Sequence, residues 1–173
     1  MCFKLLQCGF FFLALFFISC NTKKKDIESK DYSIHFFSNG SISDISIHND
    51  SNLGTRNIFF DSIGNILSIE NKINHLRDGQ IIWFYPNGII ENTAIYKNNK
   101  ENGAAFMFYE NGSIKNHRYW LNGKREGYTT DFIQDSIGTL KNIYYYQNDT
   151  VVWSSPAGEK AKGISINPVN PTK

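Results

Sequence analysis

The sequence predicts an all-β protein made of tandem antiparallel β-hairpins, about five units of 24 residues, that form one elongated twisted sheet. The first observation is a series of turn glycines at intervals of 24, 24, 24 and 26 residues, namely Gly40, Gly64, Gly88, Gly112 and Gly138. The second is an interleaved glycine series at intervals of 25, 24 and 24, namely Gly54, Gly79, Gly103 and Gly127. The third is the composition, because 15% of the residues are aromatic and no stretch after residue 31 keeps a helical period. Two glycine series with one period indicate a repeat array, and the missing helical period predicts that helices are short or absent.

The amino terminus is typical of an export signal. Lys4 precedes an apolar run over residues 5–18, which is broken only at residues 7–9 and is short for a bilayer span of roughly 20 residues. The run ends in Ser19-Cys20, and a small residue before a cysteine at that point resembles the bacterial lipobox. The resemblance implies that residues 1–19 are removed and that Cys20 carries the lipid. The alternative is a plain secretory signal or a short buried helix, with Cys20 incidental.

Cysteine usage agrees with a lipid-anchored protein. Cys2 and Cys8 lie within the expected signal, so Cys20 would be the only cysteine of the mature chain. No thiol would then remain for a disulfide, a metal site or nucleophilic catalysis. Residues 20–31 are polar and charged, as expected of a solvated linker behind the anchor. Asn21 stands where an inner-membrane lipoprotein would carry Asp, which favours the outer membrane of the bacterial cell envelope.

The repeat domain is expected over residues 32–153. Each unit has an apolar strand, a glycine turn such as Tyr85-Pro86-Asn87-Gly88, and a second strand that begins two residues after the glycine. In the second and fifth units, residues 61–64 and 135–138, we expect the turn to be one residue longer. Polar links such as residues 98–103 join successive units. Residues 154–173 contain three prolines and are expected to form a flexible tail or a cap over the last strand edge.

Bulky side chains recur at matching places along these units. We place Phe36, Phe59, Phe84, Phe108 and Phe132 at one equivalent position. Tyr96, Trp120 and Tyr146 each lie eight residues past their turn glycine. Because neighbouring strand residues point to opposite faces, such positions form two columns across stacked hairpins. One column should make the core, and the other is either a second packed face or an exposed aromatic strip.

At these residues the sequence resembles the bacterial variant of the MORN repeat. Residues 79–88 (GQIIWFYPNG) and 103–127 (GAAFMFYENGSIKNHRYWLNGKREG) carry the resemblance most closely. In the second unit polar residues stand at 56 and 57, and in the fifth Asp131 replaces a hydrophobic residue. The resemblance implies a long twisted sheet of hairpins that serves as a binding or scaffolding surface. Many bacterial proteins of this kind are tagged as YwqK-type putative antitoxins.

The sequence shows no set of residues that predicts an enzyme. The four histidines occupy different places in their units and have no metal-ligand spacing, and no nucleophile elbow or phosphate-binding loop is present. Carboxylates such as Glu70, Glu91, Glu110 and Asp131 are scattered, and Asp61 is explained by turn formation. We therefore expect no cofactor and no metal. A formal charge of +2 gives no electrostatic case for a nucleic-acid partner.

The aromatic residues are the only repeated chemical feature. They could stack on sugar rings or bury against a partner protein, or they could simply build the core of a thin sheet. The candidate binding aromatics are Trp83, Tyr85, Tyr96, Tyr109, Trp120 and Tyr146.

Three functions stay open at this point. The first is a non-enzymatic envelope lipoprotein that displays a binding or scaffold surface to a protein or glycan partner. The second is an antitoxin or immunity-like protein of a toxin system. The third is an envelope hydrolase, which is the least favoured because the carboxylates are scattered and form no repeated or clustered catalytic set.

Overall fold

The computed structural model describes residues 24–49, 54–134 and 139–156, and it contains strands and turns but no helix in that part of the chain. The expected signal peptide, Cys20 and most of the expected tail lie outside the described residues. Within them, no helix is long and apolar enough to cross a membrane. The strands are β1 (Ile27–Glu28), β2 (Tyr32–Phe36), β3 (Ile42–Asn49), β4 (Gly54–Phe60), β5 (Ile66–Ile73), β6 (Leu76–Arg77), β7 (Gly79–Phe84), β8 (Ile90–Lys97), β9 (Lys100–Phe108), β10 (Ile114–Leu121), β11 (Lys124–Arg125), β12 (Gly127–Phe132), β13 (Leu140–Gln147) and β14 (Thr150–Pro156).

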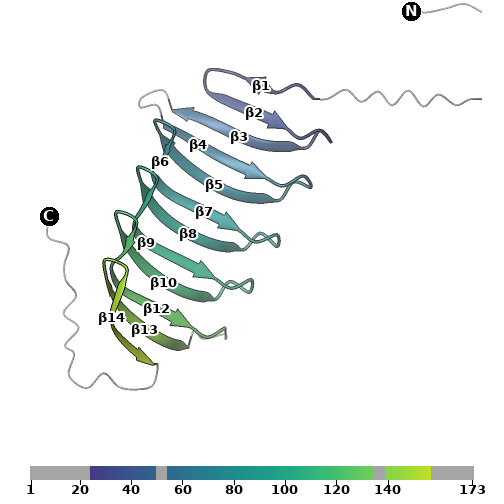
Figure 1. Cartoon of the computed structure of the whole chain (residues 1–173). Coiled ribbons are helices and arrows are strands. Elements are labelled where there is room, and N and C mark those ends of the chain that lie inside the picture. Colours follow the sequence, from purple (N-terminus) through teal and green to yellow (C-terminus); the bar gives the residue numbers. More distant parts are fainter. Residues whose placement is uncertain (1–23, 50–53, 135–138, 157–173) are drawn as a thin grey trace, which may run out of the picture.

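All described strands belong to one antiparallel sheet whose spatial order follows the chain (Figure 1). Twelve strands lie on the main path from β1 to β14, while the short β6 and β11 pair only with β5 and β10. Hairpin turns line one side of the ribbon, and the links between units line the other (Figure 1). Sequential pairing of this kind needs only short connections, which is why a 24-residue repeat can build it. The predicted all-β hairpin array is confirmed.

The hairpin turns are four-residue turns that glycine closes. In the third hairpin Gly88 N donates to Tyr85 O at 2.9 Å, and Tyr85 N donates to Ile89 O at 2.8 Å. Gly88 has φ +81°, a left-handed conformation that costs glycine little. The Asn87 side chain contributes by accepting the Ile89 N–H at 3.0 Å. The first, third and fourth turns are therefore held by their glycine and by an asparagine side chain that caps the returning strand, and in the second turn Asp61 accepts the equivalent bond.

Three details of the expected turns and register are wrong. The second hairpin has the same turn as its neighbours, because Gly64 N donates to Asp61 O and Asp61 N donates to Asn65 O. Its turn is therefore not longer, and Phe60, paired with Ile66, is the equivalent of Phe84 paired with Ile90. Phe59 instead occupies the place of Trp83. In the fifth hairpin the closing bond runs from Ile133 N to Thr139 O, which is two residues longer than in the others.

The described links between units, at residues 74–75, 98–99, 122–123 and 148–149, are two-residue turns in which both central residues have positive φ. Asn98 and Asn99 have φ of 48° and 65°, values that asparagine tolerates better than most residues. The last three of these links also donate a backbone hydrogen bond to the unit before. Asn99 N donates to Arg77 O at 3.0 Å, and Asn99 Oδ1 accepts the Arg77 N–H at 2.7 Å. The same pair of bonds joins Asp149 to Arg125, so the links form a second hydrogen-bonded ladder beside the sheet.

The two faces of the sheet differ in burial. We call the face that carries Ser33, Asn57, Ile81 and Arg118 the inner face, and the opposite face the outer face. Arg77 of β6 reaches over the inner face. By strand register, every residue classed as buried lies on the inner face, namely Ser33, Asn57, Ser68, Glu70, Ile81, Ala94, Ala105, Asn116, Thr129 and Tyr146. Ile81, at 0% exposure, is its centre. The core of this thin protein is a half-polar layer on one face.

The folded array is slightly longer than the expected repeat domain. β1 lies within the segment expected as linker, and β14 runs to Pro156, inside the segment expected as tail.

Candidate interaction surfaces

Four of the six candidate aromatics gather on the inner face. Trp83 and Tyr96 meet edge to face, with ring centroids 6.3 Å apart. Tyr96, Trp120 and Tyr146 stand near the links, and each is paired across the strands with a glycine of the second series, Gly79, Gly103 or Gly127. A Cβ added at Gly79 would meet Asn71 and one added at Gly103 would meet Ile95, so the space that these two glycines leave lies beside those side chains and not beside the rings.

Tyr85 and Tyr109 lie elsewhere, in the hairpin turns. Tyr85 Oη donates to the carbonyl of Phe108 at 2.8 Å, and Tyr109 Oη donates to that of Phe132 at 3.1 Å. Both bonds reach 23 residues ahead, into the next hairpin. These two tyrosines tie successive units together, so their hydroxyl groups are already in use.

Residues of the links cover two of the inner rings. The Arg125 guanidinium lies 4.4 Å from the Tyr146 ring centroid and donates to Tyr146 Oη at 3.0 Å. Arg77 lies 5.7 Å from the Tyr96 ring and also donates to Glu70 at 2.7 Å. Tyr146 is 8% exposed. Tyr96 and Tyr146 thus act as core side chains beneath arginine covers, and whether any candidate ring also binds a partner stays a prediction.

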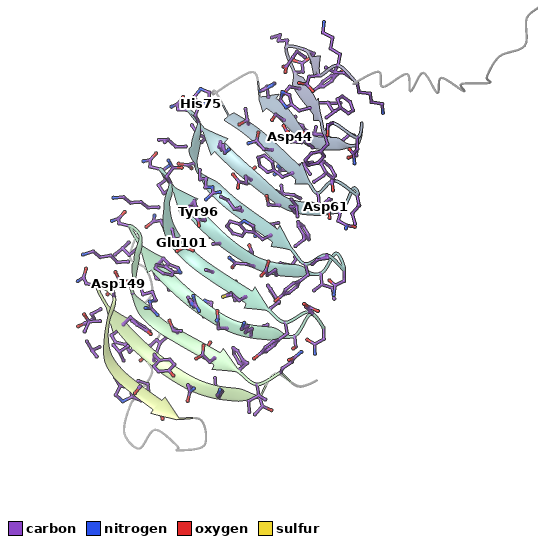
Figure 2. The ribbon with its side chains drawn as sticks, turned by 45° about the vertical axis from the view of Figure 1, so that its right-hand side comes forward. Asp44, Asp61, His75, Tyr96, Glu101 and Asp149 are labelled. Carbon is purple, nitrogen blue, oxygen red and sulfur yellow. The ribbon has the colours of Figure 1, made fainter. Side chains whose placement is uncertain are left out.

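The middle link breaks this pattern, because Glu101 stands where its neighbours have arginine. Figure 2 shows Glu101 close to Tyr96 on the sheet. Burial raises the pKa of the Glu101 carboxyl, and Arg118 only partly offsets the effect. Burial, with help from Glu101, also raises the pKa of Tyr96. Nearby, two buried atoms of β10, Trp120 Nε1 and Asn116 Oδ1, have no hydrogen-bond partner within the described part of the protein.

The outer face carries a ladder of isoleucines. Strand register pairs Ile34 with Ile45, Ile45 with Ile58, Ile58 with Ile69, and Ile69 with Ile82, so one row crosses five consecutive strands. The row continues through Thr93, Phe106 and His117. The rings of Phe106 and His117 stack with centroids 4.7 Å apart. Burial lowers the pKa of His117, so this row is neutral at pH 7. None of these residues is fully buried.

A second row on the outer face exposes large side chains to solvent. These are Tyr32 (43%), Ile47 (43%), Ile95 (43%), Tyr119 (44%) and Tyr128 (39%). By register, Tyr32 pairs with Ile47, and Tyr128 pairs with Tyr145 at 4.9 Å between ring centroids. Arg56 is the one ionisable side chain other than tyrosine that the register places in this row within the described strands. The outer face therefore exposes large apolar side chains, interrupted in this row by the polar residues Arg56, Asn71 and Gln80, and no other described element covers it.

The aromatic signal did not reveal the outer face as the more exposed surface. A signal for it is present in the sequence, because the isoleucines at 34, 45, 58, 69 and 82 alternate in spacing between 11 and 13 residues. With this spacing, the isoleucines of neighbouring antiparallel strands lie opposite one another on the same face of the sheet. A shallow cleft of about 280 Å³ also opens beside the turns, lined by Asn65, Ile66, Phe84, Pro86, Asn87 and Gly88.

The carboxylates of Glu70 and Asp61 make contacts that stabilise the sheet and its turns. Glu70 is bound by Arg77, with Lys72 at 3.5 Å. Burial works against the charge on Asp61, but hydrogen bonds from Asn65 and the turn backbone outweigh it and lower the pKa of that carboxyl. Asp61 sits at the hairpin-turn side of the sheet, opposite to His75 and Asp149 (Figure 2). Within the described segments, no group of three His, Cys, Asp or Glu side chains could hold a metal ion.

Comparison with protein families identifies two repeats. Residues 77–98 and 101–122 match the MORN repeat variant, and they correspond to the units from β6 to β8 and from β9 to β10. No curated protein sequence matches the chain. Among solved structures, a mutant of S. aureus TarM in complex with Fondaparinux, alpha-GlcNAc-glycerol and UDP is similar with a TM-score of 0.43 and 14% identity, over 61% of this chain and 21% of that one. A second TarM structure gives a TM-score of 0.42 and 16% identity over the same shares. The chain thus spans about a fifth of either TarM chain.

Proposed function

We propose that this protein is a non-enzymatic binding or scaffold module that docks a protein partner on its outer face. The observation that carries the proposal is the row of isoleucines from Ile34 to Ile82, flanked by exposed Ile47, Ile95 and Tyr119. Contiguous apolar surface on a soluble domain commonly marks an interaction site. MORN-type repeats, of which the chain carries two matched units, are suited to such a role because each unit adds area to one continuous sheet.

The chemistry of the central row of the outer face favours a protein over a glycan. A sugar is held by aromatic rings together with polar groups that satisfy its hydroxyls. The central row of the outer face offers mainly isoleucine, with Thr93 and His117 as its polar members in the middle strands. Apolar contact with few charges is the character of the buried centre of a protein–protein interface.

The cellular setting in this proposal comes from the sequence. Cys20 would carry a lipid and hold the sheet at the bacterial envelope through two or more acyl chains, because one chain alone binds a membrane only marginally. Cys20→Ala should move the protein from the membrane fraction to the soluble fraction. A protein that stayed in the membrane fraction after this change would contradict the anchor without touching the binding proposal.

Site-specific photo-crosslinking in intact cells tests the binding surface. A photoreactive amino acid at Ile95 or at Tyr119 should give the same adduct from both outer-face positions. Ile133 is a matched control, because it is equally exposed at 47% but lies in the fifth hairpin turn. No adduct from the outer positions, or an equal adduct from Ile133, would refute the proposal. A toxin as the captured partner would assign the antitoxin-like or immunity-like role to this same surface.

A further inference from the structure

The first strand of the sheet is held by an unusual histidine contact. His35 lies on β2, with Nδ1 2.6 Å from Asp44 Oδ1 and Nε2 3.1 Å from Glu28 Oε1. Asp44 belongs to β3 and Glu28 to β1, so the imidazole bridges three strands. An ionised carboxylate can only accept hydrogen bonds, and a neutral imidazole has one N–H to donate. Only the doubly protonated imidazolium can satisfy both contacts.

β1 is a two-residue strand at the edge of the sheet. It pairs with β2 over two residues, Ile27 with Ile34 and Glu28 with Ser33. Asp26 accepts the Phe36 N–H at 3.1 Å, and the Ser29 turn closes on Tyr32. A two-residue strand at a sheet edge opens at small cost, because its hydrogen bonds are few and exposed. A side-chain contact can therefore shift its equilibrium.

The charged groups around His35 all favour the protonated ring. Glu28 and Asp26 face it from the β1 segment, and Asp44 faces it from β3. Phe59, which pairs with Asp44 on β4, is uncharged. The hydrogen bond with Asp44 raises the pKa of His35; burial opposes this, while the charge of Asp44 and the Glu28 contact add to the rise.

We propose that His35 is a protonation-dependent clasp that decides whether residues 26–31 belong to the sheet or to the chain segment before it. With the imidazolium present, Glu28 is bound and β1 is docked. With the neutral ring, one of the two contacts is lost, and the contact to the exposed Glu28 yields before the shorter one to Asp44. Released residues extend by about 3.3 Å each, which lengthens the connection to the sheet.

The direction of the pH effect follows from the raised pKa of His35. Its contribution is complete below the ordinary histidine value of 6.5 and disappears as the pH rises through the higher folded value. If Cys20 is lipidated, as proposed above, the clasp would set how far the sheet stands from the membrane. The clasp itself needs neither a membrane nor a partner, so its test can fail while the proposed function stands, and the reverse also holds.

Amide hydrogen exchange of the full chain at pH 6 and pH 9, corrected for the intrinsic rate of exchange, measures the docking of β1. The amides of β1 and of Phe36 should lose protection at pH 9 by about two- to fivefold, the size expected for a half-exposed ion pair. Amides of β8 and β9 serve as the internal reference.

Three variants make the result specific. His35→Gln should remove the difference between the two pH values. Glu28→Gln should also remove it, because an amide can donate to or accept from either form of the ring. His48→Gln, on the neighbouring strand, should leave the wild-type difference intact. Equal protection of β1 at both pH values in the wild type, or an unchanged pH difference in His35→Gln, would overturn the proposal.

Discussion

Replacing Ile81 by alanine tests which face holds the fold together. Ile81 is 0% exposed; in its row the small Ala94 lies on one side, and Glu70, on the other, is held by Arg77. Their side chains cannot fill the space that the substitution leaves. Removing three carbon atoms costs about 2.4 kcal/mol at about 0.8 kcal/mol each, and the cavity brings the expected loss to about 3 kcal/mol.

Ile82→Ala is the matched control. Ile82 is the next residue of the same strand, has the same side chain and lies partly exposed on the outer face. The same three carbon atoms lose less water-excluded surface there, so we expect a loss of about 1 kcal/mol. Urea unfolding followed by tryptophan fluorescence and circular dichroism gives both values, provided that the two probes report one transition. A loss for Ile82→Ala as large as that for Ile81→Ala would refute the assignment of the core to the inner face.

Three further predictions follow from single contacts. Gly103→Ala should lower the free energy of unfolding by about 1–2 kcal/mol, because φ is +133° and an added Cβ would lie 3.2 Å from Ile95 Cβ. Gly54→Ala is the control, since its φ is not positive and the nearest atom to an added Cβ is 3.8 Å away. In the same urea assay it should change the free energy of unfolding by less than about 0.5 kcal/mol. Arg77→Met should lower the free energy of unfolding by about 2–3 kcal/mol, because it leaves the buried Glu70, 6% exposed, with only Lys72 as an ion-pair partner. The double variant with Glu70→Gln should lose less stability. Equal losses would show that the loss does not come from the unpaired Glu70 carboxylate. Because the pKa of Glu101 is raised in the folded protein, the free energy of unfolding should fall as the pH rises from the ordinary value of 4.5 to the higher folded value. Glu101→Gln should therefore flatten the plot of stability against pH in that range and raise stability slightly at pH 7. An unchanged plot would contradict this assignment.

The repeat and its strand order could be predicted because they depend on local signals. A glycine that adopts positive φ every 24 residues, next to asparagine, specifies a turn whatever the rest of the chain does. The register errors arose where local signals are ambiguous. Phe59 and Phe60 are both phenylalanine, and only the pairing with Ser68 and Ile66 shows which one matches Phe84. One residue of slip exchanges the two faces, since side chains alternate along a strand.

The sequence by itself therefore determined the all-β class, the period of 24 residues and the position of nearly every turn, because each depends on the conformational preferences of a few neighbouring residues. The tertiary structure decided which face of the single sheet is core. Tyr96 and Tyr146 are core residues because Arg77 and Arg125 reach across from the links to cover them. It also brought His35 between Asp44 and Glu28, and aligned five isoleucines from separate strands into one exposed row. These contacts depend on which strands lie side by side and in what register, which residue types alone do not contain.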